Sequence, residues 1–438
     1  MIRRQLLFIA GGIALILVFV FFLCPIFFPT LCKKKERCKT QVSLEVWGVY
    51  DDSSIFGDLV KKYEKLNKCA TIRYEKKNFD DYEEQLINAF ASDKAPDIFM
   101  IHNTWLPKHK DKLKELLPAE LLPFPDFRAA FVDVIEQDLT EENKIYALPL
   151  YVDTLALYYN KEYFNTAGIS YPPTTWDELI EVSEKLTKRN KSGQIERAGI
   201  ALGTAENINR STDILALLML QNGTVMVSPT KDTVTFSRSV AGETGLYYPG
   251  RDALRFYTDF ANPSKTTYTW NKQMPYSIDA FIEGKTAMMI NYSHQIDIIK
   301  LKAPYLNFAV GPMPQLTERD FDINYANYWA FAASKRVKSP EEAWKFIVYL
   351  TNKENSQKYL ERTKKPTARR DLVEWQQKDL EFWIFAKQSL TAKTWYQIDN
   401  SRVEKIFADA INSVILGSAS VAKALETAAS QINLLMKK

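Results

Sequence analysis

Aromatic and polar side chains gather where several predicted strands end. Four segments show this pattern: Trp47-Gly48-Val49-Tyr50-Asp51-Asp52, His102-Asn103-Thr104-Trp105, Tyr292-Ser293-His294 and Tyr325-Ala326-Asn327. In open α/β sheets, ligands bind beyond the carboxyl ends of the strands. An aromatic face packs against the apolar face of a sugar ring or another flat ligand, and Asp, Asn and His side chains hydrogen-bond its hydroxyls. Any one of these residues could serve core packing or a turn instead, so the predicted binding site depends on the pattern recurring at four strand ends.

Motifs of common catalytic and cofactor sites are missing from the sequence. It contains no Gly-rich phosphate loop, no dinucleotide fingerprint, no Cys-x-x-Cys, no His-Glu-x-x-His and no Gly-x-Ser-x-Gly elbow. The three histidines, His102, His109 and His294, are too few to favour a His-based triad or a multi-His metal site. Carboxylate pairs such as Asp51-Asp52 are usually solvated loop residues. The sequence therefore favours a binding protein over an enzyme and predicts neither a cofactor nor a metal site.

The charge distribution argues against nucleic acid as a partner. The 438 residues include 57 Lys and Arg and 53 Asp and Glu, a net charge of +4. Residues 1–39 hold seven of the basic residues and one acid, so the rest of the chain carries 50 basic and 52 acidic side chains. A body so close to neutral lacks the basic surface that binds phosphates. The 46% apolar and 25% charged composition is that of a globular protein, and a chain of 438 residues is long enough for two or three domains.

The N-terminal segment predicts a membrane anchor. Residues 6–32 contain no charged side chain, and Leu6–Leu23 is an unbroken run of apolar and small residues, long enough to span a bilayer. The small residues that signal-peptide cleavage or lipid attachment to a cysteine requires are missing before Cys24 and Cys32. We therefore expect an uncleaved transmembrane helix that contacts lipid through residues 6–28, followed by a basic linker up to residue 40. A cleaved signal peptide is the alternative.

The next part of the chain alternates between strand and helix patterns. Strands are predicted at 42–47, 71–75 and 97–101, with amphipathic helices between them at 56–66 and 80–92. This β-α-β-α-β order predicts a parallel sheet covered by helices. Further helices and strands are predicted downstream: a helix with the capping box Thr175/Glu178, an apolar helix at 211–221, a strand at 286–291, and helices at 340–350, 401–416 and 421–437.

Two of the four cysteines precede neighbouring predicted strands. Cys38 lies just before the first strand and Cys69 just before the second, so both fall at the same end of a parallel sheet. A Cys38–Cys69 disulfide is then geometrically plausible and would suit an oxidising exterior. Two unrelated thiols are an equally good interpretation.

Six stretches of the chain resemble the extracellular solute-binding proteins of ABC importers, of the maltose-binding-protein-like type (family 1). They are Ala95-Pro96-Asp97-Ile98-Phe99, Ile145-Tyr146-Ala147-Leu148-Pro149, Leu157-Tyr158-Tyr159-Asn160-Lys161-Glu162, Pro173-Thr174-Thr175-Trp176-Asp177-Glu178-Leu179, Ala280-Phe281-Ile282-Glu283-Gly284-Lys285-Thr286-Ala287-Met288 and Ser339-Pro340-Glu341-Glu342-Ala343-Trp344-Lys345-Phe346. Each stretch alone is weakly specific, but their common order over residues 42–438 is specific.

The resemblance implies a two-lobe, periplasmic-binding-protein-like (type II) α/β fold with discontinuous lobes behind the N-terminal transmembrane helix. It predicts lobe one at 42–149 and 306–360, and lobe two at 150–305 and 361–438. The ligand would lie between the lobes and be trapped by their closure. The implied function is that of a membrane-anchored extracellular receptor, not an enzyme, that hands a carbohydrate to the permease subunits of an importer.

The same resemblance implies which residues line the cleft. They are Trp47, Tyr50, Asp51, Asn103, Trp105, Tyr151, Asp153, Tyr292 and His294, to which we add Asn327, Trp329 and Trp395. Two of these positions depart from the family pattern. Asn327 stands in a loop that is often Gly-rich in relatives, and His294 stands where some sugar binders have Trp. Because binding loops vary while the scaffold persists, the ligand stays open.

Two other functions remain possible from the sequence. An anchored carbohydrate-active hydrolase could use Asp51 or Asp153, provided that a second carboxylate lies at the right spacing. A sensor or adhesion module could use the same fold. The basic residues also leave the topology open: two precede the span and five follow it, which by the positive-inside tendency would place the body in the cytoplasm. The family resemblance predicts the opposite, an extracellular body.

Overall fold

The computed structural model describes residues 41–242, 245–317 and 321–437. The predicted membrane anchor, residues 6–28, and its basic linker lie outside this range. Within the described part of the chain, no helix combines the length and the apolar character that crossing a bilayer requires.

Cys69 is disulfide-bonded. The other three cysteines, Cys24, Cys32 and Cys38, lie outside the described residues. The pairing of Cys69 with Cys38 therefore stays a prediction.

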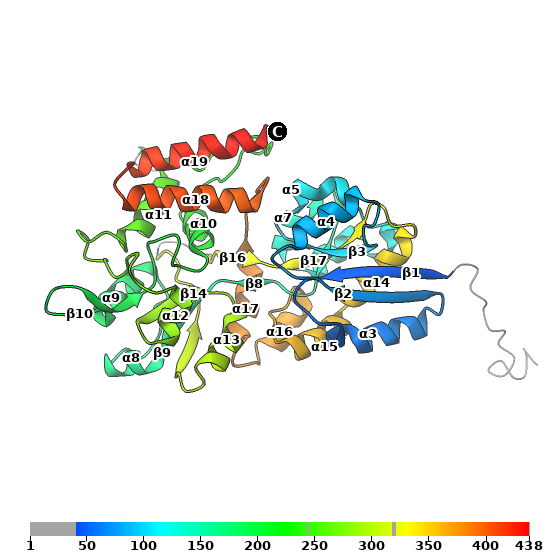
Figure 1. Ribbon diagram of the computed structural model, residues 1–438, viewed down its shortest axis with the longest axis horizontal. Coiled ribbons are helices and arrows are strands. Elements are labelled where there is room, and N and C mark those ends of the chain that lie inside the picture. Colours follow the sequence, from blue (N-terminus) through cyan, green and yellow to red (C-terminus); the bar gives the residue numbers. More distant parts are fainter. Residues whose placement is uncertain (1–40, 243–244, 318–320, 438) are drawn as a thin grey trace, which may run out of the picture.

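The first sheet, at the right of Figure 1, has the strand order β2-β1-β3-β17-β4, with β7 paired to β17. Its strands are β1 (Val42–Gly48), β2 (Ala70–Lys76), β3 (Ile98–His102), β4 (Leu113–Lys114), β7 (Leu148–Pro149) and β17 (Trp329–Ser334). The parallel pairing of β1 with β2 and β3 confirms the predicted sheet. β17 is antiparallel to β3, and Trp329 lies opposite His102 in their register. Residues far apart in the sequence thus meet at one end of this sheet.

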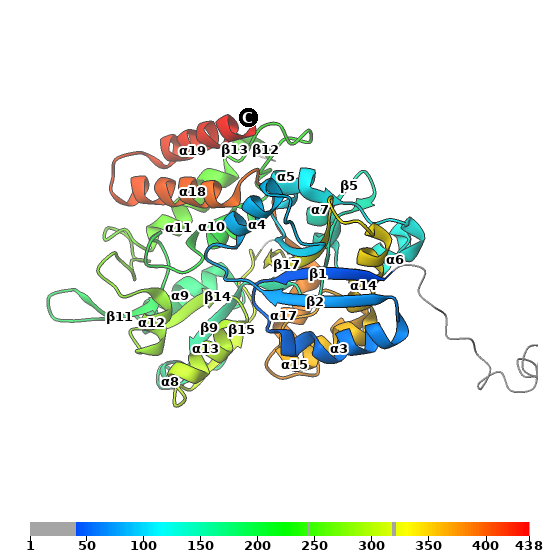
Figure 2. The same cartoon turned by 45° about the vertical axis from the view of Figure 1, so that its right-hand side comes forward.

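Helices cover both faces of the first sheet. α3 and α15 lie on one side and α4, α5 and α7 on the other (Figure 2). The predicted helix at 56–66 is amphipathic as expected: Phe56, Leu59 and Tyr63 of α3 are buried, whereas Leu66 at its end is exposed. The helical elements of this lobe are α3 (Ser53–Leu66), α4 (Tyr82–Ala91), α5 (Leu106–His109), α6 (Phe124–Ala130), α7 (Asp133–Leu139), α14 (Pro340–Thr351), α15 (Lys353–Thr363) and α16 (Val373–Gln376), with a small hairpin of β5 (Thr140–Glu141) and β6 (Lys144–Ile145).

The second sheet has the order β10-β11-β14-β9-β15. Its strands are β9 (Ala156–Asn160), β10 (Lys188–Arg189), β11 (Ile195–Ile200), β14 (Thr286–Asn291) and β15 (Phe308–Gly311). β11 and β14 are parallel, while β9 runs antiparallel to both β14 and β15. Its helices are α8 (Lys161–Thr166), α9 (Trp176–Leu186), α10 (Ser211–Gln221), α11 (Pro249–Asp259), α12 (Ser277–Ile282), α13 (Gln295–Lys302), α17 (Trp383–Gln388), α18 (Asn400–Ile415) and α19 (Val421–Met436), and β12 (Val240–Gly242) pairs with β13 (Gly245–Tyr247).

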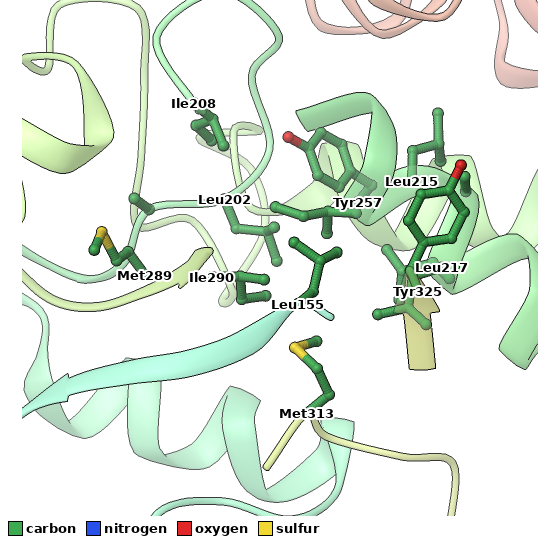
Figure 3. Packing of buried hydrophobic residues seen from close by; sticks show 14 of the residues in the cluster. Leu155, Leu202, Ile208, Leu215, Leu217, Tyr257, Met289, Ile290, Met313 and Tyr325 are labelled. Atoms are coloured by element: carbon green, nitrogen blue, oxygen red, sulfur yellow. The ribbon is translucent and has the colours of Figure 1, made fainter. Parts of the chain in front are cut away.

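The core of the second lobe forms around α10. Figure 3 shows Leu215 and Leu217 of this helix near Tyr257 of α11 and Tyr325, with Leu155 between them and Ile290 of β14. Because almost every side chain from Ile214 to Met219 is buried, the helix is apolar on all sides and lies inside the lobe. α18 and α19 pack side by side over this lobe (Figure 1), so the start of α18 is held in a fixed position.

The chain crosses between the lobes more than once, as the resemblance implied. β8 (Asp153–Thr154), β16 (Asn324–Asn327) and β18 (Ala392–Lys393) form a small sheet of order β18-β16-β8 between the two large ones. The first crossing runs from β7 through β8 to β9, and the second from β16 to β17. A third passes beside the first, where the Val152 amide donates to the Pro366 carbonyl at 3.1 Å.

The lobes divide differently from the prediction at two places. β15, expected in lobe one, pairs with β9 in the second sheet, so the chain changes lobe at β16–β17 and not near residue 306. Ala368 and Leu372, expected in lobe two, are buried in the core of lobe one. Both differences arise because the crossings are short extended segments, whose composition does not distinguish them from the loops of either lobe.

Candidate ligand-binding cleft

Lobe one presents aromatic rings to the space between the lobes. Tyr50 follows β1 and stacks on Phe79, with ring centroids 5.5 Å apart and an interplanar angle of 27°. Both rings are open to solvent, at 43% and 52% exposure. Trp329, at the start of β17, supports them edge-on, with its centroid 5.9 Å from that of Tyr50. The pair forms a fixed apolar platform of the kind that sugar rings pack against.

The platform is backed by a second layer of rings. The Trp329 ring contacts those of Tyr82, His102 and Trp105, at centroid distances of 5.8, 5.5 and 5.0 Å. Burial lowers the pKa of His102 to about 4, so its imidazole is neutral at physiological pH. Its Nδ1 lies 2.7 Å from the Thr104 hydroxyl, and the Asn327 side chain also hydrogen-bonds the ring. Trp329 therefore cannot move without disturbing a packed aromatic cluster.

Lobe two presents charged groups to the same space. Arg210 precedes α10 in a left-handed conformation (φ 65°), and its guanidinium lies 5.4 Å from the centroid of the Tyr292 ring. The Tyr292 hydroxyl donates to Asp213 Oδ2 at 2.8 Å. Arg210, Asp213 and Glu404 of α18 line a cavity of about 430 Å³. The end of β14 and the starts of α10 and α18 together position these groups.

The pKa values of the two carboxylic acids of this wall, Asp213 and Glu404, are both raised. Burial raises the pKa of Asp213. Burial and the nearby Asp213 carboxylate raise the pKa of Glu404 to about 7. Burial opposes the charged form of Arg210, but its acidic neighbours outweigh that effect and its pKa is raised as well. Glu404 is an exposed residue as a whole, and it lines the cavity.

The two walls face each other. Arg210 is close enough to influence the pKa values of both Tyr50 and His102 in lobe one. At the edge of the cleft, the Trp105 indole donates to the Asn400 side chain at 3.2 Å, which joins lobe one to the first turn of α18. Asn400 also hydrogen-bonds Glu404. The aromatic rings of lobe one therefore lie near the ionisable groups of lobe two, whose cavity is lined by lobe-two residues alone.

A second link between the lobes lies beside the first. Lys108 of α5 contacts Glu83 at 2.8 Å and Asp399, the N-cap of α18, at 3.2 Å. His109 Nε2 lies 2.7 Å from the same Glu83. Burial opposes ionisation of Glu83, but its hydrogen bonds with His109 and Lys108 outweigh burial and lower its pKa to about 2.

Two predicted carboxylates hold the crossing segments. Asp51 accepts hydrogen bonds from Lys365 and from the Tyr359 hydroxyl, both at 2.7 Å. Asp153 accepts from the amide and hydroxyl of Ser293, the latter at 2.8 Å. Both carboxylates are thus engaged by neighbouring residues of the crossings.

The remaining predicted residues near the crossings differ in exposure. Tyr151 is buried under the Lys365 ammonium, which lies 4.6 Å from its ring centroid. Tyr292 is buried and forms part of the lobe-two wall. His294 keeps a side chain that is 44% exposed, with Nδ1 3.9 Å from Asp153. His294 is thus available to a ligand, whereas Tyr151 is not.

Three predicted residues lie away from the platform. The Trp47 indole donates back along its own strand to Glu45 at 2.7 Å. Asn103 donates to Asp138 of α7 at 3.1 Å, and Trp395 stacks on Phe407 with centroids 5.7 Å apart. Asn103 and Trp395 line a second cavity between the lobes, of about 360 Å³, which shares no lining residue with the first.

Five residues of the cleft were not predicted. They are Phe79, Arg210, Asp213, Asn400 and Glu404. Phe79 follows β2 and could have been found by the strand-end rule that found Tyr50. The other four begin helices of lobe two, and nothing in their local sequence distinguishes them from ordinary helix starts. Within the described residues, no cluster of three or more His, Cys, Asp or Glu side chains could hold a metal ion.

Comparison with known proteins gives the family. The model of the bacterial extracellular solute-binding proteins matches residues 48–357, well over half of the chain. The chain belongs to this family. Among its relatives, the maltodextrin-binding protein MdxE of Bacillus subtilis is 27% identical over 381 residues, which are 84% of this chain and 83% of the relative.

Solved structures of solute-binding proteins share the fold. The cyclic α-maltosyl-1,6-maltose binding protein of Arthrobacter globiformis superposes with a TM-score of 0.77 at 18% identity, over 91% of this chain and 99% of that one. The sugar-binding protein MalE of Xanthomonas citri gives a TM-score of 0.75 at 20% identity, over 90% and 98% of the two chains. The predicted resemblance and the two-lobe α/β fold are thereby confirmed.

Proposed function

We propose that this solute-binding protein is the membrane-anchored receptor of an ABC importer and that it binds a carbohydrate between Tyr50 of lobe one and Arg210 of lobe two. The pairing of an exposed aromatic platform with a wall of hydrogen-bonding groups carries this proposal, because a sugar ring has an apolar face and a polar edge. The names of the relatives support it, since they include binders of maltodextrin and of a cyclic maltosyl sugar.

The receptor would act outside the cell, tethered by residues 6–28. The uncharged N-terminal stretch supports the tether, and the extracellular family supports the location. The ligand would then pass to the permease subunits of the importer. Protease added to intact cells tests the topology: digestion of the body confirms an outside location, and digestion only after lysis refutes it.

Binding without turnover is the expected behaviour. Asp51 and Asp153, the carboxylates that the sequence offered to a hydrolase, each hold a crossing segment through hydrogen bonds. Because general acid–base work on a glycosidic bond needs two free carboxyl groups, these two are unsuited to it. A sugar bound by the protein should therefore be recovered unchanged.

Thermal unfolding of the full chain in detergent, with a panel of mono- and oligosaccharides, tests the proposal. A ligand that binds only the folded state stabilises it by about 2.7 kcal/mol at 100 times its dissociation constant. Amino acids, peptides and phosphate serve as controls. A shift by one sugar that is lost in Tyr50→Ala supports the cleft. A shift by controls alone refutes the carbohydrate assignment, and consumption of the sugar refutes binding without turnover.

A further inference from the structure

The cavity in the lobe-two wall is lined by more acidic than basic side chains. Its carboxylates are Glu206, Asp213 and Glu404, and its cations are Arg210 and Lys405. Glu206 is already paired with Lys272, which lies outside the lining, at 3.5 Å. In the part of the chain that the structure describes, no basic side chain approaches Asp213 or Glu404 within 4.0 Å. Two carboxylates of the cleft therefore lack an ion-pair partner.

The Arg210 guanidinium near these carboxylates also has an N–H group without a hydrogen-bond acceptor among the described residues. Arg210 Nε is buried and makes no hydrogen bond to any described residue. A buried donor without an acceptor is costly, so an oxygen atom of a bound ligand would stabilise it. The same ligand would have to satisfy the two carboxylates, which take hydrogen-bond donors or a positive charge. The ligand that fits this wall therefore carries a hydrogen-bond acceptor next to a strong hydrogen-bond donor.

A sugar with a free amino group meets both requirements. Resting on the proposed carbohydrate function, we propose that the ligand is an amino sugar whose protonated amine pairs with Asp213 and Glu404. A neighbouring hydroxyl oxygen accepts from Arg210, and the ring packs on Tyr50 and Phe79. An ammonium is a better match than a hydroxyl because charge-assisted hydrogen bonds are about twice as strong as neutral ones.

The electrostatics of this wall favour a bound cation. Burial is the main cause of the raised pKa values of Asp213 and Glu404, but the Asp213 carboxylate also raises the pKa of Glu404. The pKa of Arg210 is raised because Asp213 and its other neighbours outweigh the effect of burial. An ammonium placed between the carboxylates would lower the pKa values of both. An acidic sugar would do the opposite, because its carboxylate would meet two others of the same sign.

Three oligosaccharide series with one backbone test the inference. Chitosan oligomers carry an amine at carbon 2, their N-acetylated forms carry an amide, and cello-oligomers carry a hydroxyl. Calorimetric titration of the full chain in detergent measures each affinity, with maltodextrins as a further neutral sugar. We expect the amine series to bind at least tenfold more tightly than the other three. Neutral sugars binding as tightly as the amines would overturn the inference and leave the carbohydrate function standing. No binding by any of the four series would overturn both.

Variants of the wall give a second, independent readout. Glu404→Gln and Asp213→Asn keep the shape of the side chain and remove its charge. Each should weaken amine binding about tenfold and change neutral-sugar binding less than twofold. Asp409→Asn is the matched control, because Asp409 lies on the same helix as Glu404 but does not line the cavity. Equal losses for amine and neutral sugars, or an equal effect of the control, would refute the role of the carboxylates. The unfolding midpoint of each variant verifies its fold.

Discussion

Asp51 is the predicted binding residue for which the structure argues most directly against contact with a ligand. Its carboxylate accepts from Lys365 and from Tyr359, each at 2.7 Å, and it is 8% exposed. Replacing Lys365 by Met leaves a carboxylate in a largely desolvated place without its cation. Breaking a buried ion pair in this way costs about 3–5 kcal/mol. Because the Lys365 side chain retains 20% exposure, we expect a loss below that range, about 2–3 kcal/mol of unfolding free energy.

Urea unfolding followed by tryptophan fluorescence measures this loss. Lys62→Met is the control, since the Lys62–Glu354 pair has a similar distance of 2.8 Å but lies at the surface, where an ion pair contributes little to stability. The double variant Asp51→Asn/Lys365→Met should be more stable than Lys365→Met alone, because the uncompensated charge is gone. The reasoning is refuted if Lys365→Met unfolds like the control while Asp51→Asn abolishes sugar binding at unchanged stability.

Three further predictions concern the cleft. Phe79→Ala should weaken sugar binding three- to tenfold without loss of fold, because the ring is exposed and its stacking contributes about 0.5–1.5 kcal/mol; isothermal titration measures it. Trp105→Phe removes the hydrogen-bond donor to Asn400 and should weaken ligand binding, because the closed arrangement of the two lobes loses this link. Solution scattering with ligand present should then give a larger radius of gyration. His102 is held neutral with a pKa near 4, below its unfolded value of about 6.5. Its contribution to stability is therefore complete above pH 6.5 and lost as pH falls toward 4, by about 3 kcal/mol, and His102→Gln should flatten that part of the stability profile.

Local sequence signals predicted the elements of the fold well. The capping box at Thr175 and Glu178 forms both of its hydrogen bonds at the start of α9. Gly417 adopts a positive φ of 68° just beyond α18, as expected of a residue that ends a helix. Such signals act over a few residues and need no knowledge of the rest of the chain. The division into lobes depended instead on the partner that each strand finds, and β15 joined the sheet of lobe two.

The residues of the two walls of the cleft also differed in how far the sequence predicted them. The strand-end rule found Tyr50 and Trp105, because the ends of parallel strands lie at one edge of a sheet whatever the remaining topology. The strand-end rule could not find Glu404, because this residue lies on a helix, α18. Glu404 reaches the cleft only because the last crossing carries the chain from lobe one back to lobe two. Asn103 and Trp395 satisfied the rule or the resemblance, yet hydrogen bonding and ring stacking turn them toward another cavity.

This difference bears on how specificity is distributed between the lobes. The lobe-one platform is neutral and aromatic, and its rings are fixed by a buried cluster around Trp329. Such a surface accepts many sugars, since every pyranose has an apolar face. The charged groups lie on the lobe-two wall, near the starts of helices. Residues at these positions can be substituted without disturbing a sheet. Discrimination between related sugars should therefore depend on Arg210, Asp213 and Glu404. Replacing these three residues by other types should change which sugar is preferred, while the platform keeps a general affinity for sugars.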